Sequence, residues 1–413
     1  MAQSGTVEYL VVVSHKDVPQ QTAIIQAFAG AGLGVFEYVP ESATPPASSR
    51  GRTRLGIVTS VAPSTPVPVR ILVYRHDAPV TQSMTETTFT RLTRELDSAA
   101  VDVMRSGTVA MTVRVTLPED DLVPALDWSF ALLRAILQAT GGVAIDPIAQ
   151  RCYTTADLVA FTEGDLFTHI AIHFEPDQVD TRWIHTHGLQ KFHCPELELL
   201  GVPTPLEPEA VALLRDIARH LARGERIAAG DDIDMGQPRR LSTATRPLDA
   251  DHAAAFGRLC IIDRPLPAER EHLSITRYLK EATLLSAEHA FAERDYVTAT
   301  DAIERVLTVD PDDAVALTLR ARILLVDGDP IDALGVGELL TLRVAGDYRG
   351  PYVCGLALTA LGRYPEALTQ FDLAASLDPE APETFAARAV ALERVGYLER
   401  AAEDRARASY LRQ

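Results

Sequence analysis

A repeat of 34 residues dominates the C-terminal third of this 413-residue chain. Small residues recur at two phases of the period: Ala299, Ala333, Ala367 and Ala401 at one, and Ala287, Ala321, Gly355 and Ala389 at the other. Such a period is typical of helical-hairpin solenoids, in which small residues let neighbouring helices approach each other. The repeat therefore predicts about four stacked helical hairpins over residues 277–413.

These hairpins resemble the tetratricopeptide repeat (TPR) family. Each unit has room for two helices with small residues at fixed positions, and Asp-Pro pairs begin at Asp310 and Asp378, where a helix must end. The resemblance is strongest in the first and third units. The third unit has Phe371 at a position where the second has Gly337 and the fourth has Arg405.

The resemblance implies a concave groove, lined by the first helix of each unit, that binds a segment of a protein partner. The family register places eight residues on this surface: Leu284, Glu288, Phe291, Arg322, Leu325, Tyr352, Leu356 and Val390. The set is mixed and rather apolar. It does not match the Lys/Asn/Arg clamp with which some TPR proteins hold a C-terminal carboxylate. The alternative is that the linker or the N-terminal part covers the groove internally.

The N-terminal part has the alternating pattern of an α+β region. A valine-rich strand (7–13), a helix and a Gly-rich turn before a second strand are followed by the same order over residues 111–145. A helix is expected between them, over 85–104. The repeated order predicts a duplicated α/β unit with mixed or antiparallel sheets. The expected divisions are 1–106 and 107–224 for the two units, 225–276 for a linker or strap, and 277–413 for the all-α solenoid.

Histidines gather in two neighbouring segments of the second unit. In the segment 168–174, the apolar Ile170, Ile172 and Phe174 alternate with His169 and His173. Side chains alternate between the two faces of a strand, so these histidines are expected to share a face. In the segment 181–187, the same alternation puts His185 and His187 opposite Ile184. A hairpin of the two strands would gather four histidines on one side of one sheet.

Imidazole groups placed in this way can bind a divalent transition metal. One hypothesis is a metal-assisted hydrolase in which His185 and His187 are ligands, with His193 nearby, and Glu196 is a ligand or the general base. No H-E-x-x-H or C-x-x-C motif accompanies the histidines. The competing interpretation is a polar sheet face that packs under a helix or binds a partner, in a protein of interaction rather than catalysis.

A short stretch of the same region, residues 183–199 (WIHTHGLQKFHCPELEL), resembles segments of uncharacterised bacterial domains that occur together with TPR-like repeats. That resemblance implies no activity. The P-loop and nucleophile-elbow patterns are absent from the sequence.

Charge and cysteine content limit the partners and the compartment. The net charge is −18, and residues 280–413 carry 14 Lys and Arg against 23 Asp and Glu, a net charge of −9. Such a balance argues against a nucleic-acid partner or an anionic membrane surface. The four cysteines are widely spaced, which favours free thiols over a disulfide framework. The first residues lack the pattern of a signal peptide. We expect a cytoplasmic protein.

Overall fold

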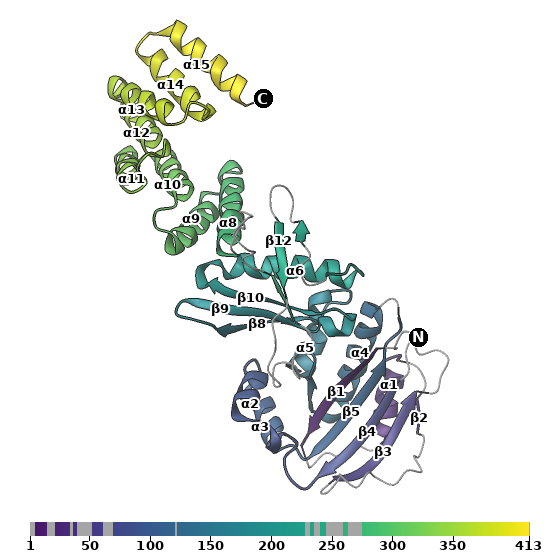
Figure 1. Ribbon diagram of the computed structural model, residues 1–413. Coiled ribbons are helices and arrows are strands. Elements are labelled where there is room, and N and C mark those ends of the chain that lie inside the picture. The colour runs from purple at the N-terminus through teal and green to yellow at the C-terminus, as the bar shows by residue number, and fades with distance from the viewer. Residues whose placement is uncertain are drawn as a thin grey trace.

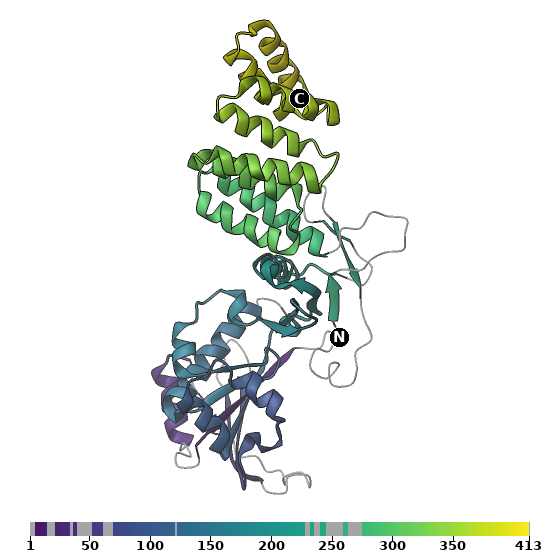
Figure 2. The same cartoon turned by 90° about the vertical axis from the view of Figure 1, so that its left-hand side faces the viewer.

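The computed structural model of the chain describes residues 5–14, 21–33, 36–38, 52–60, 69–119, 122–227, 232–234, 240–244, 259–262 and 275–412. In this part of the chain, two β-sheets are followed by a helical solenoid that extends away from them (Figures 1 and 2). The N-terminal region is therefore α+β and the C-terminal region all-α, as the sequence predicts.

The first sheet is antiparallel and has the strand order β2-β3-β4-β5-β1-β6-β7 in the described residues. Its two central strands, β1 and β5, pair along their full length, from Thr6 opposite Thr116 to Val13 opposite Val109. The strands are β1 (Thr6–Val13), β2 (Phe36–Tyr38), β3 (Arg52–Ser60), β4 (Val69–His76), β5 (Val109–Thr116), β6 (Val143–Asp146) and β7 (Arg151–Tyr153).

Helices cover both faces of this sheet. On β1, Tyr9 and Val11 point into a core shared with α1 (Gln21–Gly30) and α4 (Leu122–Thr140). Val12 points to the opposite face, where Met104 of α3 packs against it. Alternate residues are thus buried on both sides, which explains the continuous run of valines. α4 is long and apolar enough to cross a membrane by composition, and half of its apolar window is buried within the fold.

The opposite face carries η1 (Val80–Ser83), α2 (Glu86–Thr93) and α3 (Ser98–Ser106). The single helix expected over 85–104 is two helices. Thr85 caps the first, because its side chain accepts a hydrogen bond from the Thr88 N–H at 3.2 Å. Asp97 then caps the second by accepting from the Ala100 N–H at 2.8 Å, so the chain breaks and restarts before it.

The expected division between residues 106 and 107 differs from the structure. β5, β6 and β7 lie in the same sheet as β1 to β4, because β5 pairs with both β1 and β4. The repeated order is present as β1-α1-β2 and β5-α4-β6. Because β5 pairs with β1 along its full length, the strands of both halves share one sheet and do not form two separate units.

The second sheet is mixed, with the order β11-β12-β13-β10-β9-β8. β13 runs parallel to β10 and lies within the predicted linker 225–276, most of which is outside the described residues. The elements from β7 onward are α5 (Thr155–Ala160), η2 (Leu166–Thr168), β8 (Ala171–Pro176), β9 (Thr181–His187), η3 (Leu189–Phe192), β10 (Glu196–Pro203), η4 (Thr204–Leu206), α6 (Glu207–Ala222), β11 (Asp232–Asp234), β12 (Arg240–Ala244) and β13 (Leu259–Ile262).

Four helical hairpins form the C-terminal solenoid. Their first helices are α8 (Ile275–Ala292), α10 (Ala314–Asp327), α12 (Arg349–Ala360) and α14 (Pro382–Arg394). Their second helices are α9 (Tyr296–Val309), α11 (Pro330–Arg343), α13 (Tyr364–Leu377) and α15 (Leu398–Leu411). The small residues of the 34-residue repeat lie where helices meet. Gly355 is one example, because a Cβ there would be 2.6 Å from the Phe371 ring.

The solenoid is joined to the second sheet through its first hairpin. Ile275, Tyr278 and Leu279 of α8 belong to the same buried core as α6 and β10. Arg305 of α9 donates to both carboxylate oxygens of Glu209 on α6, at 2.7 and 2.6 Å. The first solenoid helix is therefore part of the core of the preceding region.

Candidate functional site

The histidine-rich hairpin predicted from the sequence is present as β8 and β9. The two strands are antiparallel, with His173 opposite His185 and Ala171 opposite His187. Directly opposed residues of an antiparallel pair project from the same face. His173, His185 and His187 therefore share one face, as the alternation predicts.

These three residues form a compact group, called here the histidine cluster. The ring centroids of His173 and His187 are 4.8 Å apart, those of His185 and His187 are 5.0 Å apart, and those of His173 and His185 are 5.8 Å apart. Trp183 lies against His185 with a centroid distance of 4.1 Å. Its indole Nε1 donates to Glu198 at 2.8 Å. His185 and His187 are fully buried.

Burial favours the neutral forms of His187 and His173. It lowers the pKa of His187 well below the usual value, and the neighbouring His185 and His173 lower it further. It also lowers the pKa of His173, with Arg91 and Arg94 acting in the same direction. His173 Nε2 donates to the Ala149 carbonyl oxygen at 3.1 Å, because a carbonyl can only accept.

His169 does not belong to this cluster, which corrects the expectation that it shares a strand face with His173. β8 begins only at Ala171, and Asp165 caps the short helix η2 just before it by accepting from the Phe167 N–H at 3.0 Å. The chain is still turning at His169, so the alternation does not reach it. Its Nε2 is instead 2.7 Å from Asp127 Oδ1 on α4, and its ring packs on Phe130.

His193 and Glu196 also have other positions than the metal hypothesis requires. His193 is exposed at the end of η3, in the left-handed conformation with φ of 58°. Glu196 is buried, and its carboxylate accepts from the Thr186 hydroxyl at 2.8 Å and from the Gly188 N–H at 2.8 Å. It also accepts from the Gln190 N–H at 3.2 Å. It thereby fixes the turn between β9 and β10.

The five histidines thus do not form one ligand set. Within the described ranges, no group of three or more His, Cys, Asp or Glu residues is arranged to hold a metal ion. Cys152, Cys194 and Cys354 are buried free thiols. Burial raises the pKa of Cys152 to about 12, which keeps it in the unreactive thiol form.

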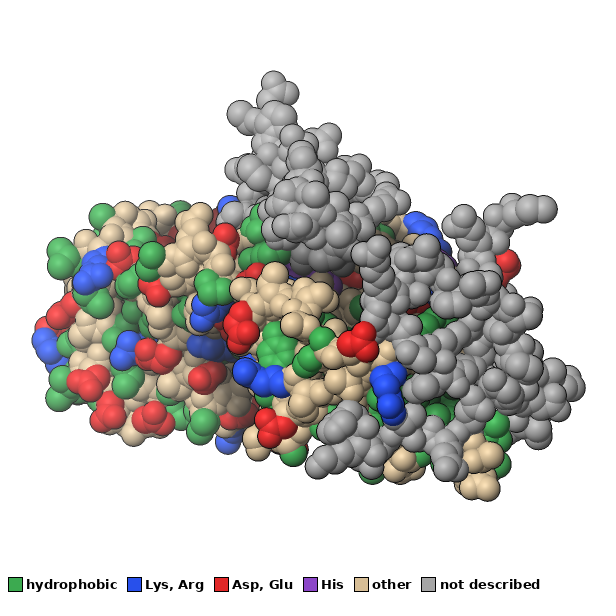
Figure 3. Space-filling model, turned by 90° about the horizontal axis from the view of Figure 1, so that it is seen from below, with side chains coloured by type: hydrophobic (Ala, Val, Ile, Leu, Met, Phe, Trp, Pro, Cys, Tyr) green, Lys and Arg blue, Asp and Glu red, His purple; other side chains and the backbone are tan. Residues whose placement is uncertain are grey.

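A second candidate site lies on the concave face of the solenoid. A cavity of about 590 Å³ is lined by residues from all four first helices, and Glu288, Arg322 and Tyr352 of the expected groove residues are among them. Figure 3 shows side chains of both charges interspersed over the described part of one face of the molecule. The cavity combines both charges with apolar side chains in the same way.

The other five expected groove residues lie elsewhere. Leu284 is buried in the core of the first hairpin, so its assignment to the groove was wrong. The Arg322 guanidinium lies over the Phe291 ring, with its Cζ 4.4 Å from the ring centroid. Leu325 and Leu356 are half-buried against the inner clusters, and Val390 is exposed outside the cavity.

The family register misses several residues that line the cavity: Tyr348, Arg349, Glu383 and Arg412. The Tyr348 hydroxyl donates to Glu383, which links the third unit to the fourth. These residues lie at helix ends, where the transferred register has no position. The missing Asp-Pro pair before α12 was the available signal that this helix begins differently.

Comparisons with known proteins bear on both regions. The C-terminal domain of DUF4026, a protein family of unknown function, matches residues 170–252. That range contains the histidine-rich hairpin and the stretch 183–199, so the resemblance to an uncharacterised domain is supported there. No curated protein matches the chain.

The C-terminal region is a TPR-like solenoid. Similar solved structures include a thermophilic TPR protein of Thermus thermophilus, with 24% identity, a TM-score of 0.30, and coverage of 32% of this chain and 74% of that chain. MamA of Desulfovibrio magneticus has 22% identity, a TM-score of 0.26, and coverage of 32% and 75%. A mutant O-GlcNAc transferase of Thermobaculum terrenum has 24% identity, a TM-score of 0.27, and coverage of 29% and 23%.

Proposed function

We propose that this protein is a cytoplasmic interaction protein whose TPR-like solenoid binds an extended segment of a partner protein along its concave face. The observation that carries the proposal is the cavity of about 590 Å³, to which all four first helices contribute. A segment lying across it would contact several units at once. Such repeated contact is how solenoids use their concave surface.

The charges in the cavity favour an acidic segment. Three arginines line it against two glutamates, although residues 280–413 carry a net charge of −9. Neither Arg322 nor Arg412 forms an ion pair with another described residue. Guanidinium groups without a counter-ion can bind carboxylates in a directional, bidentate way. Leu319, Val315 and Tyr352 supply an apolar surface beside them.

The α+β region has the separate role of binding a second partner or a ligand under this proposal. Its two sheets provide a rigid support for the solenoid through the α8 contact described above. The strongly negative net charge supports a partner that is neither a nucleic acid nor an anionic membrane.

A peptide-display selection on the full-length protein tests the proposal. Selected peptides are expected to be enriched in Asp and Glu next to an apolar residue. Their affinity is then measured for the variant Arg322→Gln/Arg412→Gln, and we expect it to fall about tenfold or more, because two charge-assisted contacts are lost.

The matched control is Arg320→Gln/Arg400→Gln. Arg320 lies on the same helix as Arg322, and neither control residue lines the cavity. The control is expected to bind like the wild type. Equal affinity of the wild type and the Arg322→Gln/Arg412→Gln variant for every selected peptide would refute binding at this face.

A further inference from the structure

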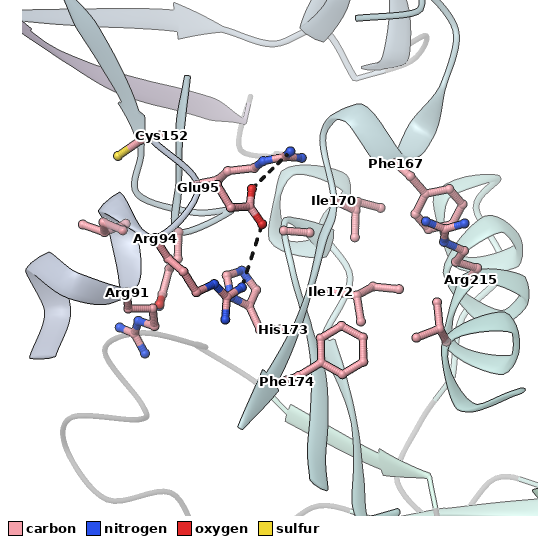
Figure 4. A pocket seen from close by; sticks show the side chains of 15 residues that line it. Arg91, Arg94, Glu95, Cys152, Phe167, Ile170, Ile172, His173, Phe174 and Arg215 are labelled. Carbon is pink, nitrogen blue, oxygen red and sulfur yellow. Dashed lines mark ion pairs between the residues drawn. The ribbon is translucent and has the colours of Figure 1, made fainter. Parts of the chain in front are cut away.

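A second cavity, of about 270 Å³, lies in the α+β region, between the helix α2 and the strand β8 (Figure 4). It is called here the arginine pocket. Strand β7 belongs to the first sheet, and helix α2 packs against it. Strand β8 belongs to the second sheet, which α6 packs against. The pocket is therefore built where the two halves of the region meet. The pocket is separate from the solenoid groove.

Positive charge is concentrated in this pocket. Arg91, Arg94, Arg151 and Arg215 line it, together with a single acidic residue, Glu95. That excess stands out in a chain whose net charge is −18. Clustered guanidinium groups create a positive potential that favours an anion among them. The arrangement indicates a site for an anion.

The ion pairs that hold these arginines are long. Glu95 is 3.9 Å from Arg94 and 3.5 Å from Arg151, and Arg91 is 3.5 Å from Glu175. A charge-assisted hydrogen bond is usually about 2.7–2.9 Å long. Glu95 thus pairs only loosely with two arginines, and an entering oxyanion can replace it.

A buried amide adds a second, independent sign of a ligand. Gln150 lines the pocket with only 9% of its surface exposed, and its Oε1 has no hydrogen-bond partner among the described residues. Its φ of 49° is a left-handed conformation that is unfavourable for glutamine. The turn that imposes it is held by Asp146, which accepts from the Ala149 N–H at 2.9 Å. A buried polar group kept without a partner is costly unless a ligand supplies one.

The opposite wall is apolar. Phe167, Ile170, Ile172 and Phe174 face the arginines of α2 across the pocket (Figure 4). Arg215 stacks over the Phe167 ring at 5.1 Å, which places a further guanidinium at the edge of this wall. A ligand that fits both walls has a charged head and an apolar body.

Access and size set further limits. A hollow of about 480 Å³ along α2 shares Arg91, Arg94, His173 and Phe174 with the pocket and provides a route of entry. The volume of about 270 Å³ lies just below the usual range for ligand pockets, about 300–1,000 Å³. A small molecule fits, and a folded partner does not.

We infer that the arginine pocket binds a small amphiphilic anion, in which a carboxylate or phosphate head contacts Arg94 and Arg151 and an apolar body packs against Phe167 and Ile172. A rotation of the buried Gln150 amide would turn one of its polar atoms toward the head and complete the polar end. Binding would bring residues of both sheets into contact with one molecule.

Isothermal titration of the full-length protein with benzoate, phenyl phosphate and neutral benzyl alcohol tests this inference. Benzoate and phenyl phosphate carry the two candidate heads on the same ring, so the tighter of the two identifies the head. Benzyl alcohol is expected to bind at least about tenfold more weakly than the tighter anion, because it lacks the charge.

Variants of the pocket provide the decisive comparison. Arg94→Gln and Arg151→Gln are expected to weaken binding of the anion about tenfold, whereas Glu95→Gln is expected to strengthen it, since the competing carboxylate is gone. A gain of affinity cannot result from misfolding. Arg219→Gln is the matched control, because Arg219 stacks on Phe167 at 5.2 Å but does not line the pocket.

The inference is overturned if neither anion binds to the wild type or to Glu95→Gln. It is also overturned if benzyl alcohol binds as tightly as both anions, or if Arg219→Gln weakens binding as much as Arg94→Gln does.

Discussion

Lys191 and Asp146 form an ion pair that is buried between the two sheets. The Lys191 Nζ lies 2.5 Å from Asp146 Oδ2 and 3.0 Å from the His169 carbonyl oxygen, and neither charged side chain is more than 1% exposed. Asp146 ends β6 of the first sheet, and Lys191 lies on η3, between two strands of the second. The pair is therefore a direct polar link between the halves of the α+β region.

Removal of one partner of this pair should be strongly destabilising. Asp146→Asn leaves the Lys191 ammonium buried without its counter-charge, which costs about 3–5 kcal/mol of unfolding free energy. Asp216→Asn is the matched control: it breaks an ion pair with Arg219 of the same 2.5 Å length whose side chains are 57% and 46% exposed, and should cost less than about 1 kcal/mol. Urea denaturation measures both, and equal losses would contradict the argument.

The double variant Lys191→Met/Asp146→Asn measures how strongly the two charges depend on each other for stability. With both charges removed, no unpaired ion remains, so the loss should be smaller than the sum of the two single losses. Additive losses would mean that the two residues stabilise the fold independently of each other.

Glu196 gives the stability a defined pH dependence. Burial raises the pKa of Glu196 from the ordinary value of 4.5 to about 7. The hydrogen bonds from Thr186 and from backbone N–H groups lower the pKa, but burial has the larger effect. A carboxyl whose folded pKa is raised stabilises the fold fully below pH 4.5, and that contribution is lost as the pH rises to about 7. In Glu196→Gln this titration is absent.

The unfolding free energy of Glu196→Gln relative to the wild type should therefore increase from pH 4.5 to about 7 and level off above it. The buried histidines are present in both proteins, so their contributions cancel in the difference. Denaturation at several pH values measures it. Glu163→Gln, a change at an exposed residue, is the control, and a pH-independent difference for Glu196→Gln would contradict the assignment.

Two glycines of α11 should respond in opposite ways to alanine. A Cβ at Gly337 would lie 2.8 Å from the backbone nitrogen of Cys354 on α12, whereas a Cβ at Gly335 meets nothing within 4 Å. Gly337→Ala must push two helices apart, at a cost of about 1–3 kcal/mol. Gly335→Ala should stabilise by about 0.5–1 kcal/mol, because alanine is the better helix former. Thermal unfolding distinguishes the two, and effects of the same sign would refute the close contact.

The docking of the solenoid predicts a contrast within α8. Leu279 is fully buried in the core shared with α6 and β10, while Leu285 is 51% exposed on the same helix. Leu279→Ala should cost about 2–5 kcal/mol and Leu285→Ala less than about 0.5 kcal/mol. Limited proteolysis should cut near residue 275 faster in Leu279→Ala only. Equal cleavage of both variants would show that α8 is not held by this core.

The solenoid was predictable because its contacts are local. Each helix packs on its sequence neighbours, so one period such as that of Ala299 and Ala333 carries both the element type and the contact. The hairpin of His173 and His185 was predictable for a similar reason, since a short turn joins two alternating strands. The prediction for His169 was wrong because the turn capped by Asp165 delays the start of β8 to Ala171, two residues after His169.

The arginine pocket could not have been found in this way. Arg91 and Arg215 come from helices far apart in the sequence, and they line one cavity only because the two sheets meet. The strand order of the first sheet has the same origin: the pairing of β1 with β5 decides which residues share a face, and no sequence period encodes it. Gln150 gave no signal, because a strained turn and an unsatisfied amide depend on the surrounding fold.

The burial of α8 in the core of the second sheet has a mechanical consequence. A partner that pulls on the distal units would load the α8–β10 contact and the Arg305–Glu209 pair, which join the solenoid to the second sheet. Force applied at the C-terminal end would thus be transmitted to β10 and its neighbour β9, the strand that holds His185 and His187. The solenoid and the second sheet would therefore respond to such a force together.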